Sequence, residues 1–96
     1  MVLNNHAFIH KKIKVLCYRL EQLSGLKLVT NLSKQMKEIK FEGSFAHIII
    51  DYRNNAIFVL NHKLIDQEML LIQDIMLYSN WLEIGEKYSH NFVTKM

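Results

Sequence analysis

The spacing of the apolar residues changes twice along this chain, and this pattern limits the folds open to it. In residues 6–23 the apolar positions follow one another at spacings of 4, 3, 4 and 3, which is one face of a helix. They are Ile9, Ile13, Leu16, Leu20 and Leu23. In residues 37–60 the spacing falls to two, as in strands, and from residue 66 the helical spacing returns. The chain is therefore predicted to be an α+β domain with a helix, a set of strands and a long C-terminal helix.

Residues 37–60 predict a three-stranded antiparallel meander. Apolar and charged residues alternate in the first strand, residues 37–42, and Gly43 begins a turn. The second strand, residues 45–51, is rich in isoleucine, and the third strand, residues 56–60, is apolar throughout. Three short strands become stable when a helix packs on one of their faces.

The turn between the second and third strands is predicted to be a two-residue hairpin loop at residues 54–55. Both residues are asparagine, which tolerates the positive φ that such a loop requires. This loop would place Asp51 opposite Phe58 and His47 opposite His62. The sequence thus makes a definite prediction of the strand register.

A break in the first helix is predicted at residues 24–25, where the apolar seam slips. Glycine at position 25 costs about 1 kcal/mol relative to alanine inside a helix. Apolar residues then keep a spacing of four as far as Met36, so we expect a helix to restart near Thr30 or Asn31.

The last helix is predicted to begin at the cap Asp66, with Glu68 in its first turn, and to run to about Ser89. Its apolar residues occupy more of its surface than one side of a three-stranded sheet can cover. They include Met69, Ile72, Ile75, Met76, Trp81 and Ile84. We therefore expect a second copy of the chain to bury part of this surface in an intertwined homodimer.

The composition fits a single domain over residues 1–96. Half of the residues are hydrophobic, 22% are charged and proline is absent, which is not the composition of a disordered or collagen-like chain. The single Cys17 cannot form an internal disulfide and favours a reducing compartment. The first residues do not resemble a signal peptide, and the longest apolar runs have four or five residues, against about 20 for a membrane span. We expect a soluble cytoplasmic protein without a membrane partner.

Catalytic and metal-binding motifs are not recognisable in the sequence. His47 and His62 would give a metal ion only two ligands, and neither a CxxC nor an HExxH motif occurs. The acids are dispersed singly, and Cys17 lies among the apolar residues of the first helix without an evident base. We expect neither enzymatic activity nor a metal or other cofactor.

The balance of charge permits a polyanionic partner. Twelve lysines and arginines against nine acids give a formal net charge of +3 and a pI near 9.1. The basic residues that stand out are Lys11, Lys12, Lys14 and Arg19 in the first helix and Lys34, Lys37 and Lys40 before and in the first strand. A solvated helix face is the usual explanation for such charges. In a homodimer, however, each would occur twice and the two sets could straddle a polyanion.

Four segments carry a resemblance to a known family. They are residues 36–43, 46–51, 56–60 and 63–70. In sequence and order they resemble the YbaB/EbfC family of small bacterial nucleoid-associated proteins. In that family the first three segments form three strands, and the fourth, which ends in Glu-Met-Leu, begins the last helix. The chain departs from that family in keeping only Gly43 between the first two strands and in carrying Leu71-Ile72 where the family has an acidic pair.

The resemblance implies a non-enzymatic homodimer in the bacterial nucleoid that binds duplex DNA with weak sequence preference. Lysine and arginine contacts to the DNA backbone would supply affinity through counterion release and would carry little base information. The candidate phosphate contacts are Lys11, Lys12, Arg19, Lys34 and Lys37.

Two alternative functions remain open. A small regulatory or inhibitor protein would bind another protein through the hydrophobic hairpin or through the surplus apolar face of the last helix, and the departures from the family pattern favour this function. A winged-helix regulator also has a hairpin next to a long helix. It ranks last, because the chain is one helix short before the hairpin.

Overall fold

The computed structural model describes residues 2–32 and 36–95, and the side chains of residues 6–32 and 36–84. Within these residues the chain forms two helices and four strands, and the predicted α+β class is confirmed. The elements are α1 (Val2–Ser24), β1 (Lys27–Leu28), β2 (Ile39–Glu42), β3 (His47–Asp51), the 3-10 turn η1 (Tyr52–Asn54), β4 (Ala56–Leu60) and α2 (Asp66–Lys95).

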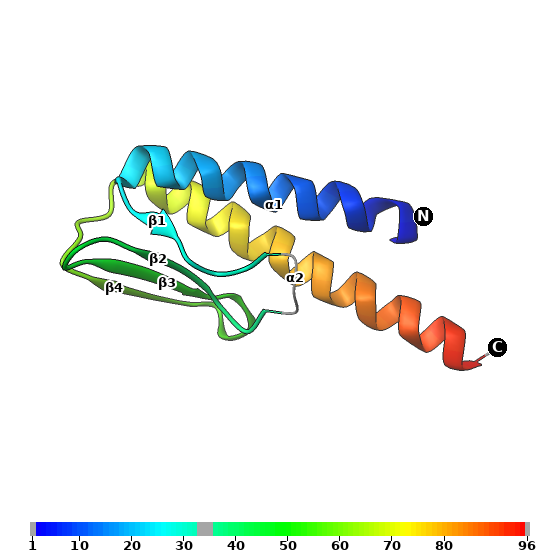
Figure 1. The fold of residues 1–96 in the computed structure, drawn as a ribbon. Coiled ribbons are helices and arrows are strands. Elements are labelled where there is room, and N and C mark those ends of the chain that lie inside the picture. Colours follow the sequence, from blue (N-terminus) through cyan, green and yellow to red (C-terminus); the bar gives the residue numbers. More distant parts are fainter. Residues whose placement is uncertain (1, 33–35, 96) are drawn as a thin grey trace.

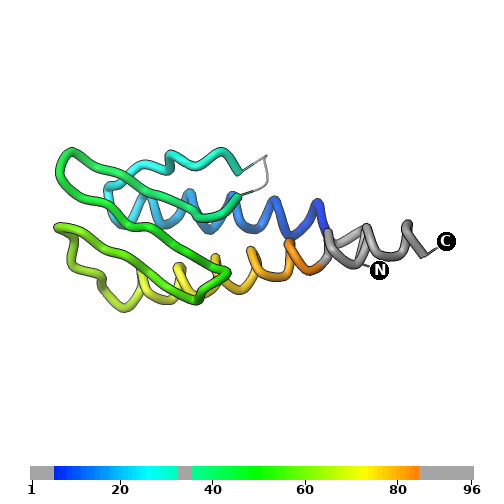
Figure 2. Tube along the Cα trace, turned by 90° about the horizontal axis from the view of Figure 1, so that it is seen from below, coloured from blue at the N-terminus to red at the C-terminus, as the bar shows by residue number. Residues whose placement is uncertain are grey.

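The elements form two layers. The strands make one antiparallel sheet in the order β1-β2-β3-β4. Figure 1 shows α1 and α2 side by side, running in opposite directions over one face of this sheet. Figure 2 shows from below that both helices extend beyond the sheet at one end. The opposite face of the sheet and the outward side of the helices are left as the two broad surfaces of the molecule.

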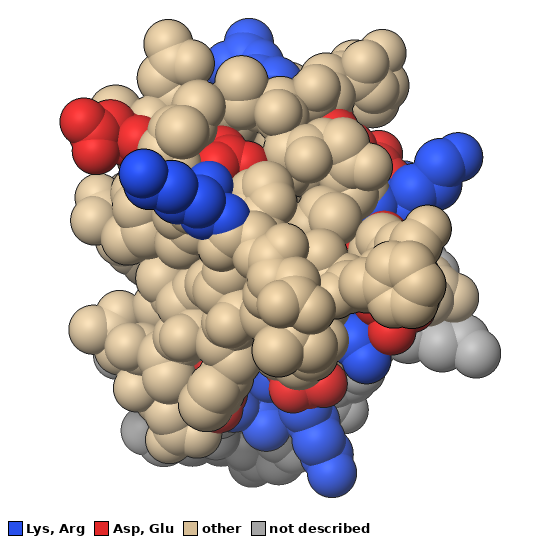
Figure 3. All heavy atoms as spheres, turned by 90° about the vertical axis from the view of Figure 1, so that its left-hand side faces the viewer, with Lys and Arg blue, Asp and Glu red and all other residues tan. Residues whose placement is uncertain are grey.

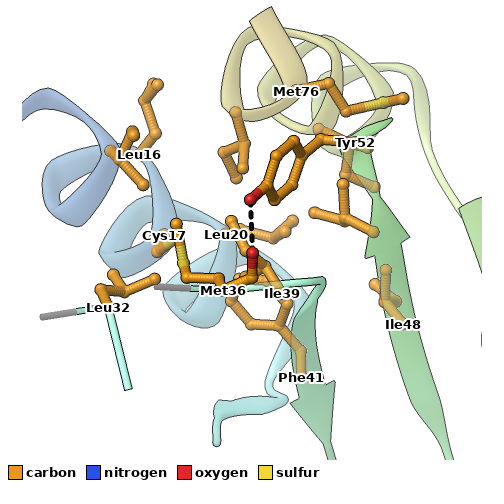
Figure 4. Packing of buried hydrophobic residues seen from close by; sticks show 14 of the residues in the cluster. Leu16, Cys17, Leu20, Leu32, Met36, Ile39, Phe41, Ile48, Tyr52 and Met76 are labelled. Atoms are coloured by element: carbon orange, nitrogen blue, oxygen red, sulfur yellow. Dashed lines mark hydrogen bonds between the residues drawn. The ribbon is translucent and has the colours of Figure 1, made fainter. Parts of the chain in front are cut away.

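The core lies between the two layers. Its fully buried members come from α1, from alternate positions of β2 and β3, and from α2 (Figure 4). They include Ile13, Leu16, Cys17, Leu20, Ile39, Phe41, Ile48, Ile50, Ile72 and Ile75. The alternation in the strands follows from side chains that point to opposite faces at successive residues. The helical seam predicted for residues 6–23 is thus confirmed in its centre.

The predicted seam is wrong at its end, where Leu23 is 40% exposed and Cys17 belongs to the core instead. A strict seven-residue repeat drifts by about 20° per heptad around a straight helix. By its third repeat the seam has turned out of the core, so Leu23 points toward the outward side of the helical layer.

The chain after α1 is a strand and not the predicted second helical segment. The break itself is confirmed, because α1 ends at Ser24 and Gly25 takes a φ of 77°, where glycine avoids the strain of a side chain. The apolar spacing of four misled the prediction. Leu32 is buried because its segment runs back along α1, where the Leu32 carbonyl lies 2.5 Å from Nε2 of His10.

The extra strand β1 makes the sheet four-stranded rather than three-stranded. Leu28 of β1 pairs with Phe41 of β2. Leu26 packs so closely against the turn after β2 that a Cβ at Gly43 would lie 2.8 Å from the Leu26 Cδ2 atom. A side chain at position 43 would therefore require the end of the Leu26 side chain to shift.

The predicted hairpin register is wrong by two residues. Asp51 pairs with Ala56 and not with the predicted Phe58, and the loop is four residues long because it contains η1. Tyr52 causes this lengthening, since its side chain turns into the core and its hydroxyl donates a hydrogen bond of 2.7 Å to the Met36 carbonyl (Figure 4). Asn55 then closes the loop with a φ of 50°. A shift of two residues keeps every side chain on its predicted face.

The ends of α2 also differ from the prediction. The N-cap is Ile65 and not Asp66, because the Ile65 carbonyl accepts the first helical hydrogen bond, from Met69 at 3.0 Å. The helix continues to Lys95 and does not end near Ser89. A single glycine inside a long helix costs only about 1 kcal/mol, which the rest of the helix outweighs.

Candidate functional site

The predicted basic residues of α1 lie on its solvent side. Lys11 and Arg19 are exposed, and Lys12 is half-buried. Lys12 and Arg19 are seven residues apart, so two helical turns bring them to the same flank, whereas Lys11 lies about 100° away around the helix. From Lys11 to Arg19 the distance along the axis is about 12 Å. The structure thus brings three of the five candidate residues onto one element.

The other two candidates do not join this group. Lys34 lies outside the described residues. Lys37 is exposed, but it precedes β2 and belongs to the sheet layer, next to Met36 whose carbonyl is bound by Tyr52. Lys14, which the sequence also singled out, is exposed on α1. The candidate surface for an anion is therefore the solvent side of α1, with Lys14 as an addition.

Charge is distributed unequally between the two helices. The helix α1 contains one acidic residue, Glu21, beside its basic residues. One carboxylate oxygen of Glu21 accepts a hydrogen bond of 2.7 Å from the Leu28 backbone N–H. Residues 66–84 of α2 carry four acids and neither lysine nor arginine. The acids are Asp66, Glu68, Asp74 and Glu83. The formal excess of positive charge thus belongs to the α1 side of the helical layer.

Apolar side chains interrupt the basic surface. Phe8 and Tyr18 are exposed on α1 by 63% and 61%. Beside Tyr18, a groove of about 540 Å³ runs between the two helices, with Arg19 and Leu23 on one wall and Leu70 on the other. A groove with apolar walls and a guanidinium at its margin suits an apolar side chain of another protein better than a phosphate.

A second uncharged surface lies at the end of the molecule where α1 finishes and α2 begins. Figure 3 views this end and shows the charged side chains at its margin, around a centre of other residues. Exposed apolar residues at this end are Phe45 in the β2–β3 turn, Leu60 at the end of β4, and Ile65 before α2. The Asn61 side chain joins the turn to the end of β4 by donating a hydrogen bond of 2.8 Å to the Phe45 carbonyl. Exposed apolar patches with a polar margin are typical of protein contacts.

The histidines do not form the cross-strand pair that the sequence suggested. His47 pairs with Leu60, and the Nε2 atom of His62 lies 2.8 Å from Oε2 of the buried Glu68. Among the described side chains, those of residues 6–32 and 36–84, no three from His, Cys, Asp or Glu stand close enough to hold a metal ion. The observed role of His62 is to help bury a carboxylate at the start of α2.

The cysteine of α1 is a core residue. Cys17 is 1% exposed, and burial, together with the nearby charge of Glu21, raises the pKa of its thiol from 9.0 to about 12. A thiol reacts as its thiolate, which is scarce at neutral pH for such a group. Cys17 therefore serves packing, as the sequence predicted, and is more fully buried than expected.

Neither helix could cross a membrane, since the described part of the chain lacks a helix that is both long and apolar enough.

The sequence did not identify the groove beside Tyr18. A signal for an exposed apolar face of α2 was present, because Leu70, which lines the groove, begins a row that continues outside it with Leu77 and Ile84 at intervals of seven. All three are exposed, by 62%, 45% and 48%. Such a stripe opposite a buried one indicates a helix with two apolar faces.

Comparisons with protein-family models, with curated proteins and with solved structures found no match to this chain. They neither support nor oppose the resemblance to the YbaB/EbfC family. A function for this chain has therefore to be argued from its own surfaces: the basic side of α1, the groove between the helices and the open parts of the sheet.

Proposed function

We propose that this chain is a non-enzymatic DNA-binding protein of the nucleoid-associated type, which acts in the cytoplasm as a homodimer and contacts duplex DNA through α1. The observation that carries the proposal is the excess of positive charge on the solvent side of α1. Lys11, Lys12 and Arg19 lie there, and the single acid of this helix is already engaged by a backbone N–H. Contacts of this kind bind the DNA backbone and select its sequence weakly.

The salt dependence of binding tests this proposal. Three contacts per chain make six in a homodimer, so affinity for each of two unrelated duplexes should fall by roughly 10³ between about 50 and about 200 mM salt. The measurement is a titration of labelled duplexes at both salt concentrations, with the mass of the protein recorded in solution. Weak binding whose affinity does not change with salt concentration would contradict the proposal.

The double variant Lys12→Ala/Arg19→Ala identifies the binding surface. It removes four contacts per homodimer, and the slope of log K against log salt should decrease by roughly 3.6 on both duplexes. The matched control is Lys27→Ala/Lys63→Ala, which removes the same charge from exposed positions outside α1 and should keep the original slope. Equal losses in the two variants, or a loss on one duplex only, would contradict the phosphate role of α1.

A second function, binding of another protein as a regulator or inhibitor, is favoured by a different observation. The groove beside Tyr18 and the uncharged end with Phe45, which is 84% exposed, offer apolar surface that DNA backbone contacts do not use. If this function holds, Leu70→Asp should abolish a stable complex with one cellular protein while DNA binding is unaffected. Gln73→Asp, at an exposed position one turn along α2, is the control. A complex that survives Leu70→Asp would exclude the groove.

A further inference from the structure

The sheet has two edges, and they differ in how their outward backbone groups are satisfied. An edge strand presents unpaired N–H and C=O groups, which act as a template for another strand unless something blocks them. Among the described residues, β1 has two residues and β4 has five. The longer edge is therefore the one that needs an explanation.

The β1 edge is closed by side chains of this chain. Val29 donates its N–H inward, to the Lys40 carbonyl at 2.9 Å, so the N–H of the preceding Leu28 points outward. That N–H is bound by the Glu21 carboxylate at 2.7 Å, and the Leu26 N–H is bound by the Ser24 hydroxyl at 3.1 Å. Another strand would have to displace a charged acceptor to pair here.

The β4 edge is open. Within the described part of the chain, none of residues 56–60 has a hydrogen bond to a side chain. The strand contains neither charge nor proline, which natural edge strands use to prevent pairing. Its last three residues, Phe58, Val59 and Leu60, are exposed by 53%, 37% and 49%. An exposed apolar edge strand of this kind is a template for pairing with another strand.

We infer that β4 pairs antiparallel with β4 of a second copy of this chain, so that two sheets join into one continuous sheet of eight strands. The inference rests on the homodimer of the proposed function and specifies its interface. A register centred on Phe58 is the one that pairs all five residues of each strand. It places Phe58 opposite Phe58 of the partner and Ile57 opposite Val59 of the partner, with apolar side chains meeting on both faces.

The neighbouring flank of α2 enlarges the contact. Asn80 donates a hydrogen bond of 3.1 Å to the Tyr52 carbonyl in η1, which leads into β4, so this flank of α2 faces the β4 side. Leu77 and Ile84 lie three and four residues from Asn80 and share its flank. Both are exposed, by 45% and 48%. An interface of standard size takes about 800 Å² from each partner, which is more than a strand about 17 Å long supplies alone.

This pairing ends at two copies. The contact is isologous, because both chains use the same strand, and joining the β4 edges leaves only β1 edges at the two ends of the sheet. Those edges are closed by Glu21 and Ser24. The α1 helices, which lie on the β1 side of each copy, stay outside the interface, so their basic residues remain open to DNA.

A matched pair of charge substitutions tests the inference. Phe58 and Val29 are both 53% exposed, lie on the same face of the sheet and occupy opposite edges. Phe58→Lys would place two like charges opposite each other across the axis and should raise the dissociation constant of the dimer about 100-fold or more. Val29→Lys adds the same charge at the closed edge and should leave it unchanged. Sedimentation of the full chain without DNA measures both, and thermal unfolding confirms that both variants fold.

A cross-link tests the register without disturbing the fold. Residues directly opposite in antiparallel strands have Cα atoms about 4.5 or 5.5 Å apart, within the range of a disulfide. Phe58→Cys should therefore form a covalent dimer on mild oxidation, and Val29→Cys should not. The native Cys17 does not compete, because burial raises the pKa of its thiol to about 12.

The outcomes separate this inference from the proposed function. A wild-type monomer at all concentrations, a Phe58→Lys variant that dimerises normally, or a Phe58→Cys variant that fails to cross-link would overturn the β4 interface. In the last two cases DNA binding by a homodimer through α1 would stand if its salt slope is as expected. A monomeric wild type would also remove the homodimer from the proposed function, and the salt slope would then be that of three contacts instead of six. A dimer that forms through β4 but does not bind DNA would overturn the proposed function and leave the inferred interface standing.

Discussion

Two glutamates, one at the end of α1 and one at the start of α2, both accept a hydrogen bond from a backbone N–H, but over different separations along the chain. Glu68 accepts the Ile65 N–H at 2.9 Å, three residues earlier in the chain, and also contacts His62. Glu21 accepts the Leu28 N–H at 2.7 Å, across the turn between α1 and β1. Each carboxylate satisfies a backbone donor that its own element leaves unpaired.

The comparison separates a local contact from a tertiary one. Glu68 stands at the third position of its helix, where a glutamate commonly reaches back to the N-cap N–H, and this spacing is visible in the sequence. Glu21 can reach Leu28 only after Gly25 has turned the chain back beside α1. The first contact starts a helix, and the second closes an edge of the sheet and so limits what can assemble with it.

The largest expected effect of removing either glutamate is at the start of α2. Glu68 is 2% exposed, so Glu68→Ala would leave the Ile65 N–H and the His62 ring without their partner in a buried site. We expect the free energy of unfolding in urea to fall by about 3 kcal/mol. Glu68→Gln keeps an acceptor oxygen and should lose less. Asp66→Ala removes an exposed first-turn acid, the predicted cap, and should cost less than about 1 kcal/mol; a larger loss there would restore Asp66 as the cap.

A smaller loss is expected at the end of α1. Glu21→Ala removes a charged acceptor from the outward Leu28 N–H and should lower the free energy of unfolding by about 2 kcal/mol. Gln22→Ala changes the exposed neighbouring residue and should stay within about 0.5 kcal/mol of wild type. Because Glu21→Ala also opens the β1 edge, its sedimentation profile should contain species larger than a dimer. Unchanged stability and mass would show that the edge is closed by something else.

The smallest expected effect is a loss of stability at alkaline pH, which comes from the thiol of Cys17 near Glu21. The pKa of the Cys17 thiol is about 12 in the folded chain, through burial first and the charge of Glu21 second, against 9.0 for an ordinary thiol. As the pH rises above about 9, the unfolded thiol loses its proton and the folded one keeps it, so unfolding is favoured. Wild type should lose about 1 kcal/mol by about pH 9.5 relative to Cys17→Ala. The free energy of unfolding in urea is measured against pH for both proteins, and parallel curves would contradict this prediction.

Much of the fold was predictable because it follows from local rules. Residues 56–60 form the strand that their apolar run indicated, and α1 ends at the predicted break. The strand β1 was missed because two residues are too short to carry a period of their own. The hairpin register was missed because the choice between a two-residue and a four-residue loop depends on where the Tyr52 ring can be buried, which is decided by Met36 and the core.

The candidate site was predictable in part. The sequence identified the basic residues of α1, since a charge on the polar side of an amphipathic helix is necessarily near solvent. It did not show that Lys37 belongs to the other layer, or that Tyr18 and Leu70 enclose a groove. Such relations join elements that are far apart in the chain, and side-chain spacing within one element carries no information about them.

By itself, the sequence determined that α1, β2, β3, β4 and α2 form and where most of their apolar faces lie, because these follow from spacings of three to four or of two residues. It did not determine β1. The tertiary structure alone decided which edge of the sheet is closed and which is open. Glu21 closes one edge because folding carries it to Leu28, and β4 has no such neighbour among the described residues. Edge protection is a contact between the end of α1 and the strand β1, and its free energy exists only once these two elements have packed against each other.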